Sequence, residues 1–332
     1  MNKINGKILI LVVSVLLLIA FFRFSENGED FSTYNPDWNG ATKIKDLISE
    51  NHTVISMPAR QDLTLLKPNG SALVVLGPRS NFSEKDIEII QKFVRSGGLL
   101  VLSDDFGTGN QLLNRLTTSV SFSGLLLQDD VSFWKNSTLA VVKANIENVS
   151  NITLNYPTSL VITNGSISVL ANTSRFSWLS KNDSRWAQSD RERESYPVIA
   201  DLAFGQGKIV VISDPSIFIN SMLPMQDNRL LLGKLVEERP FVGFDETVRM
   251  PPIPAFNYMI RNNPSFQYLF AAVVISLAFI YMKRDEISKL KTKTTKYRFD
   301  PDEDTIISEI LSRKNWDKRR FMLFRNRIRG NK

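Results

Sequence analysis

Along the first third of the chain, segments with the apolar pattern of a strand alternate with segments that have the apolar pattern of a helix. This order predicts strands and helices in turn. Short apolar runs bounded by turn residues predict three buried strands, at residues 53–57, 71–76 and 99–102. Ser83 and Asp86 have the spacing of a capping box, which predicts the start of a helix between the second and third strands. Buried strands that alternate with amphipathic helices indicate a parallel sheet covered on both faces.

The pattern changes over residues 120–185, which are rich in Ser, Thr, Asn and Val. Short β-like runs there predict an antiparallel β-rich insertion, or a loop-rich elaboration, on the α/β core. The first pattern then returns, because Val198–Phe204 and Lys208–Ser213 predict a β-hairpin. Residues Asn228–Glu238 predict a helix with Asp227 as its N-cap.

Two further segments are continuously apolar and show neither helical nor strand periodicity. The first, residues 8–24, contains an uncharged run from Ile8 to Phe22, although this run is also the length of a signal-peptide core. The second, residues 266–282, is nearly all apolar and is followed at once by Lys283 and Arg284. A buried core helix is the alternative there. The pattern predicts two transmembrane helices that flank the α/β domain.

Charge then sets the expected orientation. Residues 283–332 hold 16 Lys and Arg against 8 Asp and Glu, whereas residues 24–265 hold 22 against 26. By the positive-inside rule both termini would be cytoplasmic, and the protein would lie in the cell membrane with residues 25–265 extracellular. The predicted organisation in chain order is a cytoplasmic N-terminus 1–7, transmembrane helix 8–24, extracellular α/β domain 25–239 with the insertion at about 120–185, Pro-rich connector 240–265, transmembrane helix 266–282 and basic cytoplasmic tail 283–332.

Glycosylation sequons agree with that orientation. All of them fall in the segment predicted to be extracellular, although a chain rich in Ser and Asn produces some by chance. A sequon-rich segment without cysteine favours a glycoprotein of an archaeal cell surface. The candidate glycosylation sites are Asn51, Asn69, Asn81, Asn136, Asn148, Asn151, Asn164, Asn172 and Asn182.

Composition excludes several classes of chemistry. The chain has no Cys and a single His, His52, so it cannot form disulfides, use a thiol nucleophile or build a metal site from two histidines. The net charge of +7 suggests nucleic acid as a partner, but the positive charge belongs to residues 283–332. We therefore expect no nucleic acid.

The tail suggests partners of another kind. Residues 318–329 interleave basic side chains with Phe321, Met322, Leu323 and Phe324. A basic amphipathic segment of this kind fits either the surface of the lipid bilayer or a cytosolic protein partner. A protein partner could equally bind the α/β domain.

Three aspartates are candidates for a site. Asp104 and Asp105 follow one predicted parallel strand and Asp214 follows another, and open α/β sheets bind ligands at this edge. Carboxylates there could hold Mg²⁺ or act as acid and base. The alternative is that they cap the loops that follow.

Several stretches together resemble the prokaryotic membrane-anchored family called domain of unknown function 4350. They are Ser32–Asn35 with Gly40, the turn at residues 95–98 that leads into 99–107, and residues 196–228. Phe244-Asp245-Glu246 resembles the acidic motif of the same family. The resemblance covers about residues 30–282 and is weakest over the insertion. Asn220 and Asn228 match its pattern near the candidate edge and are added as ligand-binding candidates, with helix capping and loop hydrogen bonding as the alternative.

The resemblance implies a fold similar to class I glutamine amidotransferases, which is flavodoxin-like. The catalytic relatives need a Cys nucleophile and a His base, and this chain has no Cys, so glutaminase activity is excluded. The resemblance also implies a genomic context with MoxR-type ATPases and other membrane-complex proteins. No cofactor is expected from the sequence.

The sequence thus predicts an α/β, flavodoxin-like (class I glutamine amidotransferase-like) parallel sheet with a β-rich insertion, flanked by two transmembrane helices. The predicted function is that of a non-enzymatic two-span membrane protein in a MoxR-linked envelope system. Its exterior domain would bind a ligand or partner, and its tail would engage the membrane or a cytosolic protein. The alternative is a metal-assisted hydrolase that uses Asp104, Asp105 and Asp214.

Overall fold

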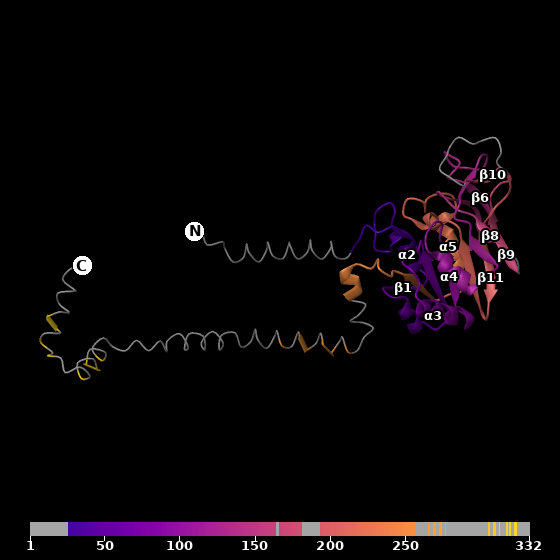
Figure 1. Ribbon diagram of the computed structural model, residues 1–332. Helices are drawn as coiled ribbons and strands as arrows, with labels where there is room; N and C mark the ends of the chain where they lie inside the picture. The colour runs from indigo at the N-terminus through magenta and orange to yellow at the C-terminus, as the bar shows by residue number, and fades with distance from the viewer. Residues whose placement is uncertain are drawn as a thin grey trace. The chain divides into compact units, whose positions relative to one another are not determined.

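A computed structural model describes residues 26–163, 166–180 and 193–256, together with isolated residues between 265 and 323. The chain divides into two compact units, Met1–Met259 and Ile260–Lys332. The folded α/β domain lies in the first unit (Figure 1).

A nine-stranded mixed sheet forms the centre of the domain, in the order β1-β13-β2-β3-β12-β11-β9-β6-β7. The first five strands in this order are parallel to one another: β1 (Thr53–Met57), β13 (Phe241–Asp245), β2 (Ser71–Leu76), β3 (Leu99–Ser103) and β12 (Gly207–Ile212). The other four pair antiparallel: β11 (Pro197–Phe204), β9 (Ile167–Asn172), β6 (Val141–Ile146) and β7 (Val149–Thr153). The sheet is therefore half parallel, where the sequence predicted a parallel one.

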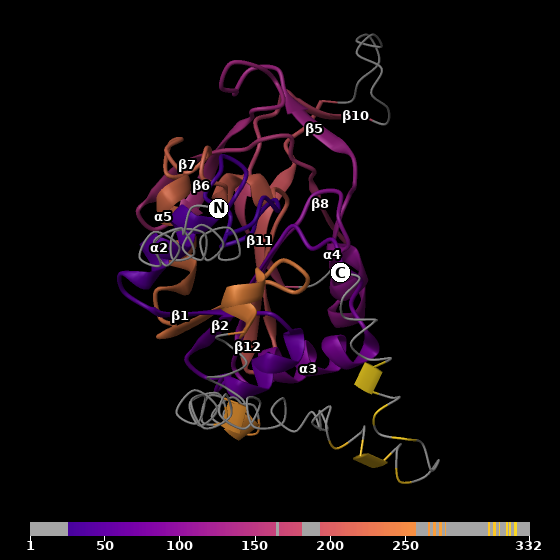
Figure 2. The same cartoon turned by 90° about the vertical axis from the view of Figure 1, so that its left-hand side faces the viewer.

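Helices cover both faces of the parallel strands (Figure 2). Helices α2 (Thr42–Ser49) and α5 (Asn228–Val236) pack on one face, and the 3₁₀ helix η1 (Arg60–Leu65), α3 (Glu84–Arg95) and α4 (Gly109–Leu116) pack on the other. All six residues of β2 are buried, since its side chains alternate between the two cores. The predicted capping box at the start of α3 is present, with Ser83 and Asp86 each bonded to the other's backbone.

The order of the parallel strands corresponds to a rearranged flavodoxin sheet. A flavodoxin-like sheet has the order 2-1-3-4-5. The order β1-β13-β2-β3-β12 has the same arrangement if β13 takes the place of the first strand. Here that strand comes last in the chain, so the simple chain order expected for a flavodoxin-like sheet is wrong. The end of the domain supplies an interior strand of the parallel region, between β1 and β2.

The described residues between 120 and 180 form antiparallel strands, three of which (β6, β7 and β9) extend the main sheet. The others make two small ribbons: β4 (Val120–Phe122) with β8 (Leu160–Ile162), and β5 (Leu126–Asp129) with β10 (Ser177–Ser180). The fully buried Asp129 ties the second ribbon together, because its carboxylate accepts hydrogen bonds from Ser132 N, Ser174 Oγ and Ser177 Oγ.

Strand β13 falls within residues 240–265, which the sequence assigned to a Pro-rich connector. Four of the five β13 residues are buried, and the strand pairs with β1 and β2. Residues 241–245 contain no proline and can therefore form a strand. The prolines on either side made the whole segment resemble a connector in the sequence.

The predicted transmembrane helices are not supported. Within the part of the chain that the structure describes, no helix is both long and apolar enough to cross a bilayer. This contradicts the flanking spans in the predicted fold class, the two-span membrane function in an envelope system, and the cell-membrane localisation with residues 25–265 outside. A run of apolar residues meets the composition requirement of a span but does not fix a continuous helix. Residues 8–24 lie outside the described residues, and 266–282 lie largely outside them.

Candidate functional site

The structure places Asp104, Asp105 and Asp214 at the carboxyl ends of two neighbouring parallel strands. Asp104 and Asp105 follow β3, and Asp214 follows β12, which pairs with β3. The chain continues from β3 to α4 on one face and from β12, through the 3₁₀ helix η2 (Pro215–Phe218), to α5 on the other face. The two loops therefore diverge at this edge.

Asp104 is buried and holds the loop that leads into α4. Its Oδ1 accepts a hydrogen bond from Gly107 N at 3.1 Å, and its Oδ2 accepts one from Gly109 N at 2.7 Å. Burial raises the pKa of Asp104 to about 6, and the nearby charge of Asp105 adds to the effect. Both carboxylate oxygens are thus committed to the backbone of their own loop.

Asp214 is fully buried and holds two separate segments. Its Oδ1 accepts a hydrogen bond from Ser216 N at 2.8 Å, at the start of η2, and its Oδ2 accepts one from Asn155 N at 2.5 Å. Burial raises the pKa of Asp214 to about 7. This carboxyl group therefore ties the insertion to the end of β12.

Asp105 differs from both because it is partly exposed and has acceptor capacity to spare. Its Oδ1 accepts a hydrogen bond from Phe106 N at 2.5 Å, and among the described residues no side chain donates to either carboxylate oxygen. Burial raises the pKa of Asp105, although the positive charge of Arg79 opposes the shift. Of the three aspartates, only Asp105 can offer an oxygen to another molecule.

The metal-assisted hydrolase has no support at this edge. Among the described residues, no group of three or more His, Asp or Glu side chains is placed to hold a metal ion. The oxygens of Asp104 and Asp214 point at backbone N–H groups, which occupy the positions that a cation would need.

The two candidate asparagines are buried and bonded within the domain. Asn220 Nδ2 donates to the carbonyls of Asn35 and Asp37, and its Oδ1 accepts from Lys43 N at 2.9 Å. Asn228 Nδ2 donates to Thr153 O at 2.9 Å, and its Oδ1 accepts from Thr153 N at 2.9 Å. Both side chains are therefore committed to backbone groups of the domain. Asn220 bonds to an N–H in the first turn of α2, whereas Asn228 bonds to β7 and caps no helix.

Asn228 and its neighbour Asp227 also close an edge of the sheet. Asp227 stands at the N-cap position of α5 but makes no capping bond with its side chain. Its Oδ2 instead accepts hydrogen bonds from Ser150 N and Asn151 N of the edge strand β7, next to the bonds that Asn228 makes. Unpaired edge strands invite pairing with other chains, and here side chains from a helix satisfy the edge.

The usual ligand crevice of this sheet is filled by the chain itself. In a flavodoxin-like order it lies between the strands equivalent to β13 and β2. Glu246, directly after β13, accepts hydrogen bonds from Thr33 N at 2.7 Å and Ser32 Oγ at 2.8 Å. Arg249 donates to Leu76 O, at the end of β2, at 2.9 Å. The motifs around Ser32 and Glu246, more than 200 residues apart in sequence, meet here.

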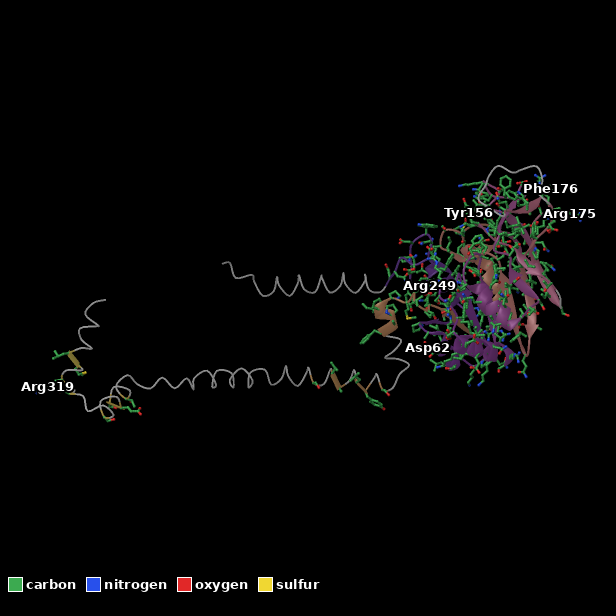
Figure 3. The ribbon with its side chains drawn as sticks, in the orientation of Figure 1. Asp62, Tyr156, Arg175, Phe176, Arg249 and Arg319 are labelled. Atoms are coloured by element: carbon green, nitrogen blue, oxygen red, sulfur yellow. The ribbon has the colours of Figure 1, made fainter. Side chains whose placement is uncertain are left out.

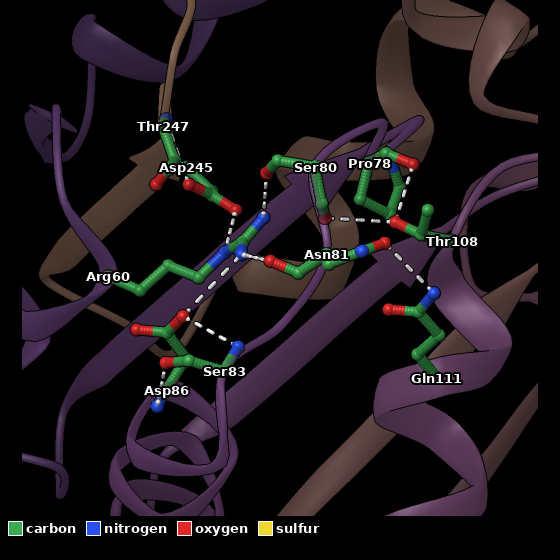
Figure 4. A network of polar contacts seen from close by, with 10 residues as sticks. All are labelled: Arg60, Pro78, Ser80, Asn81, Ser83, Asp86, Thr108, Gln111, Asp245 and Thr247. Carbon is green, nitrogen blue, oxygen red and sulfur yellow. Dashed lines mark hydrogen bonds and ion pairs between the residues drawn. The ribbon is translucent and has the colours of Figure 1, made fainter.

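A buried arginine completes the closure of this region (Figure 4). Arg60 Nε lies 2.9 Å from Asp245 Oδ2, and the two side chains are 3% and 2% exposed. The other guanidinium nitrogens of Arg60 donate to Asn81 O at 2.9 Å and Ser80 Oγ at 2.8 Å, and Asp86 lies at 3.8 Å. Sequence reasoning missed Arg60 because its partners come from two other parts of the chain, residues 80–86 and Asp245.

Exposed aromatic side chains accompany the aspartates at the carboxyl edge. Phe106 is next to Asp105 and 54% exposed, Tyr156 is next to Asn155 and 54% exposed, and Trp38 is 68% exposed. The loop of Trp38 is bonded to the segment after η2, since Ser221 N donates to Trp38 O. Figure 3 labels Tyr156 among the side chains of the insertion.

His52 and most sequons lie elsewhere on the surface. His52 lines a cavity of about 710 Å³ beside α2 and α5, and its Nδ1 donates to Arg239 O at 2.9 Å. Asn151 is partly buried, and two further sequons, at 164 and 182, lie outside the described residues. The remaining sequon asparagines are exposed: Asn51, Asn69, Asn81, Asn136, Asn148 and Asn172.

Comparison with known proteins identifies the family of the chain. The model of the family described as "Domain of unknown function (DUF4350)" matches residues 33–236. Since the match covers more than half of the chain, the protein belongs to this family. A search of curated proteins finds no relative.

Solved structures with a similar arrangement are distant. The "mmIFT52 N-terminal domain" is 16% identical over 63% of this chain and 93% of its own, with a TM-score of 0.47. "Cytoplasmic Protein STM1381" from Salmonella typhimurium LT2 is 11% identical over 61% of this chain and 80% of its own, with a TM-score of 0.35. A β-galactosidase from Bacillus circulans sp. alkalophilus is 11% identical over 51% of this chain but 22% of its own, with a TM-score of 0.32. Likenesses of this size carry no information about the activity or location of the chain.

Proposed function

We propose that the α/β domain is a non-catalytic recognition domain that binds a protein partner at its carboxyl edge, around Asp105. The observation that carries the proposal is the combination of a partly exposed carboxylate with a spare oxygen and exposed aromatic side chains on the adjoining loops. Aromatic residues are enriched at protein interfaces, and a carboxylate beside them offers a directional contact.

The chemistry of the chain supports recognition over catalysis. We propose an amidotransferase-like fold for the domain, on the resemblance described above, but the Cys that relatives of that fold use as nucleophile is missing from the sequence. The only His, His52, has Nδ1 bonded to a backbone carbonyl of Arg239 beside β1 and β13, away from the carboxyl ends of β3 and β12.

The filling of the crevice favours a protein partner over a small ligand. Glu246 and Arg249 occupy the region where a flavodoxin-like sheet binds its ligand. Cavities of about 710 Å³ and 460 Å³ elsewhere in the domain are lined by other residues. What remains accessible at this edge is a surface with Trp38, Phe106 and Tyr156, which suits a broad contact.

Site-specific crosslinking tests the proposal. A photoreactive phenylalanine analogue placed at Phe106 or at Tyr156 of the full chain, expressed in its native host, should form a covalent adduct with one and the same protein. The same analogue at Phe241, which is 44% exposed at the start of β13, is the matched control.

Asp105→Ala in the background of the Phe106 analogue should reduce the yield of that adduct several-fold. A Phe241 adduct with the same protein in equal yield would contradict the proposal. The proposal would also be contradicted if Asp105→Ala left the adduct yield unchanged, or if the analogue formed no adduct at either Phe106 or Tyr156.

A further inference from the structure

A groove on the opposite side of the sheet from α2 and α5 has no role in the recognition surface. It has a volume of about 460 Å³ and lies between η1 and α3. Its origin lies in the short crossover from β1 to β2. A six-residue 3₁₀ helix extends about 12 Å, whereas the twelve residues of α3 extend about 18 Å. The crossover therefore leaves part of α3 uncovered.

The lining of this groove includes four large apolar residues. Leu63 and Phe93 belong to the hydrophobic core beneath it and are 1% and 4% exposed. Leu66 and Ile89 are partly buried and pack against the same core. An apolar ligand lying here would continue the core outward and would bury side chains that are now partly in water.

The rim of the groove is cationic. Lys85 and Lys92 are exposed on α3 and line the groove, with Glu88 between them. Two lysines seven residues apart lie on the same side of the helix, about 10 Å from each other along its axis. Among the described residues, no carboxylate forms a salt bridge with either lysine, so both are available to an anion.

We propose that this groove binds an amphiphile with an apolar chain and one anionic head group, of the class of medium-chain carboxylates. The chain would lie on Leu63, Leu66 and Ile89, and the head group would contact Lys85 or Lys92. The volume falls in the range of small-molecule sites.

The larger cavity beside α5 offers a less suitable rim. It has a volume of about 710 Å³, and its Lys234 already pairs with Glu147 at 2.9 Å and Glu237 at 2.7 Å. Arg229 also lines the larger cavity, but so do Glu50, Glu237 and Glu238, whereas the groove beside α3 has a single carboxylate, Glu88, in its lining.

Photolabelling of the full chain with a diazirine derivative of dodecanoate tests the site directly. Peptide mapping should place the label within residues 63–68 or 85–96. Excess dodecanoate should compete the label away. Labelling confined to other peptides, or labelling that dodecanoate does not reduce, would overturn the proposal.

Charge reversal tests the role of the rim. The double variant Lys85→Glu/Lys92→Glu changes exposed residues and should keep the fold, which circular dichroism would verify. Its affinity for dodecanoate, measured as competition with the photolabel, should fall about fivefold or more, the scale of one exposed ion pair. Competition by uncharged dodecanol should stay unchanged.

The matched control is Lys43→Glu, because Lys43 is exposed on α2 and lies on the other face of the sheet. This variant should bind dodecanoate like the unchanged protein. An equal loss in the control and the double variant, or an equal loss of dodecanol competition, would refute a specific contact between the head group and the two lysines.

Discussion

Asp245→Ala removes the carboxylate that faces the buried Arg60, and its cost measures how strongly the carboxyl end of β13 is held. The Arg60 and Asp245 side chains are 3% and 2% exposed, so water cannot replace the lost partner. Removing one member of a buried pair costs about 3–5 kcal/mol. The guanidinium keeps its bonds to Asn81 O and Ser80 Oγ, and Asp86 lies 3.8 Å away. We therefore expect the lower end of this range, about 3 kcal/mol.

Equilibrium unfolding in urea, followed by circular dichroism, is the assay. The matched control is Glu84→Ala, which breaks the pair between Glu84 and Arg115, whose side chains are 75% and 53% exposed. That pair lies in water, so its loss should cost less than about 1 kcal/mol.

The double variant Arg60→Met/Asp245→Ala should recover part of the stability, since it no longer leaves a charge buried without its partner. If Asp245→Ala cost no more than Glu84→Ala, the interpretation of Arg60 as a buried tie between η1 and β13 would be refuted.

Three further predictions concern the edges of the sheet. Asp104 and Asp214 have folded-state pKa values of about 6 and about 7, above the ordinary 3.8, so the folded state holds more protons than the unfolded state between about pH 4 and pH 7. The melting temperature should therefore fall as pH rises through that window. A melting temperature that rises instead would show that folding does not raise these pKa values. Asn228→Ala should cost about 3 kcal/mol in urea unfolding, because it leaves buried backbone groups unpaired, whereas the exposed Asn145→Ala should cost under about 0.5 kcal/mol. Gly109→Ala should destabilise by about 1–3 kcal/mol in the same assay, since its Cβ would lie 2.6 Å from Asp104 Oδ2, and an unchanged midpoint would show that the loop yields freely.

Local sequence signals described the parallel half of the sheet well. The runs at Thr53–Met57 and Ser71–Leu76 are the strands β1 and β2, and the Ser83 box opens α3. These elements are coded by neighbours within a few residues. By contrast, the place of β13 depends on pairing with β1 and β2, which lie more than 160 residues earlier in the chain, so local patterning could not reveal it.

The candidate site was predictable only in part. The position of Asp104, Asp105 and Asp214 follows from strand ends, but their different roles depend on which backbone N–H groups surround each carboxylate. Asp227 had the sequence position of an N-cap, yet its side chain bonds to β7 instead. Such contacts between distant segments have no signal in a single sequence.

Recognition at the carboxyl edge is tested most directly by the affinity between the full chain and the protein recovered by crosslinking at Phe106. Isothermal titration should show binding about tenfold weaker for Asp105→Ala, as for a central contact of an interface. The control Asp201→Ala removes an aspartate that pairs with Lys208 on the hairpin of β11 and β12, and it should leave the affinity unchanged. Equal affinities for Asp105→Ala and the unchanged protein would contradict recognition at the carboxyl edge.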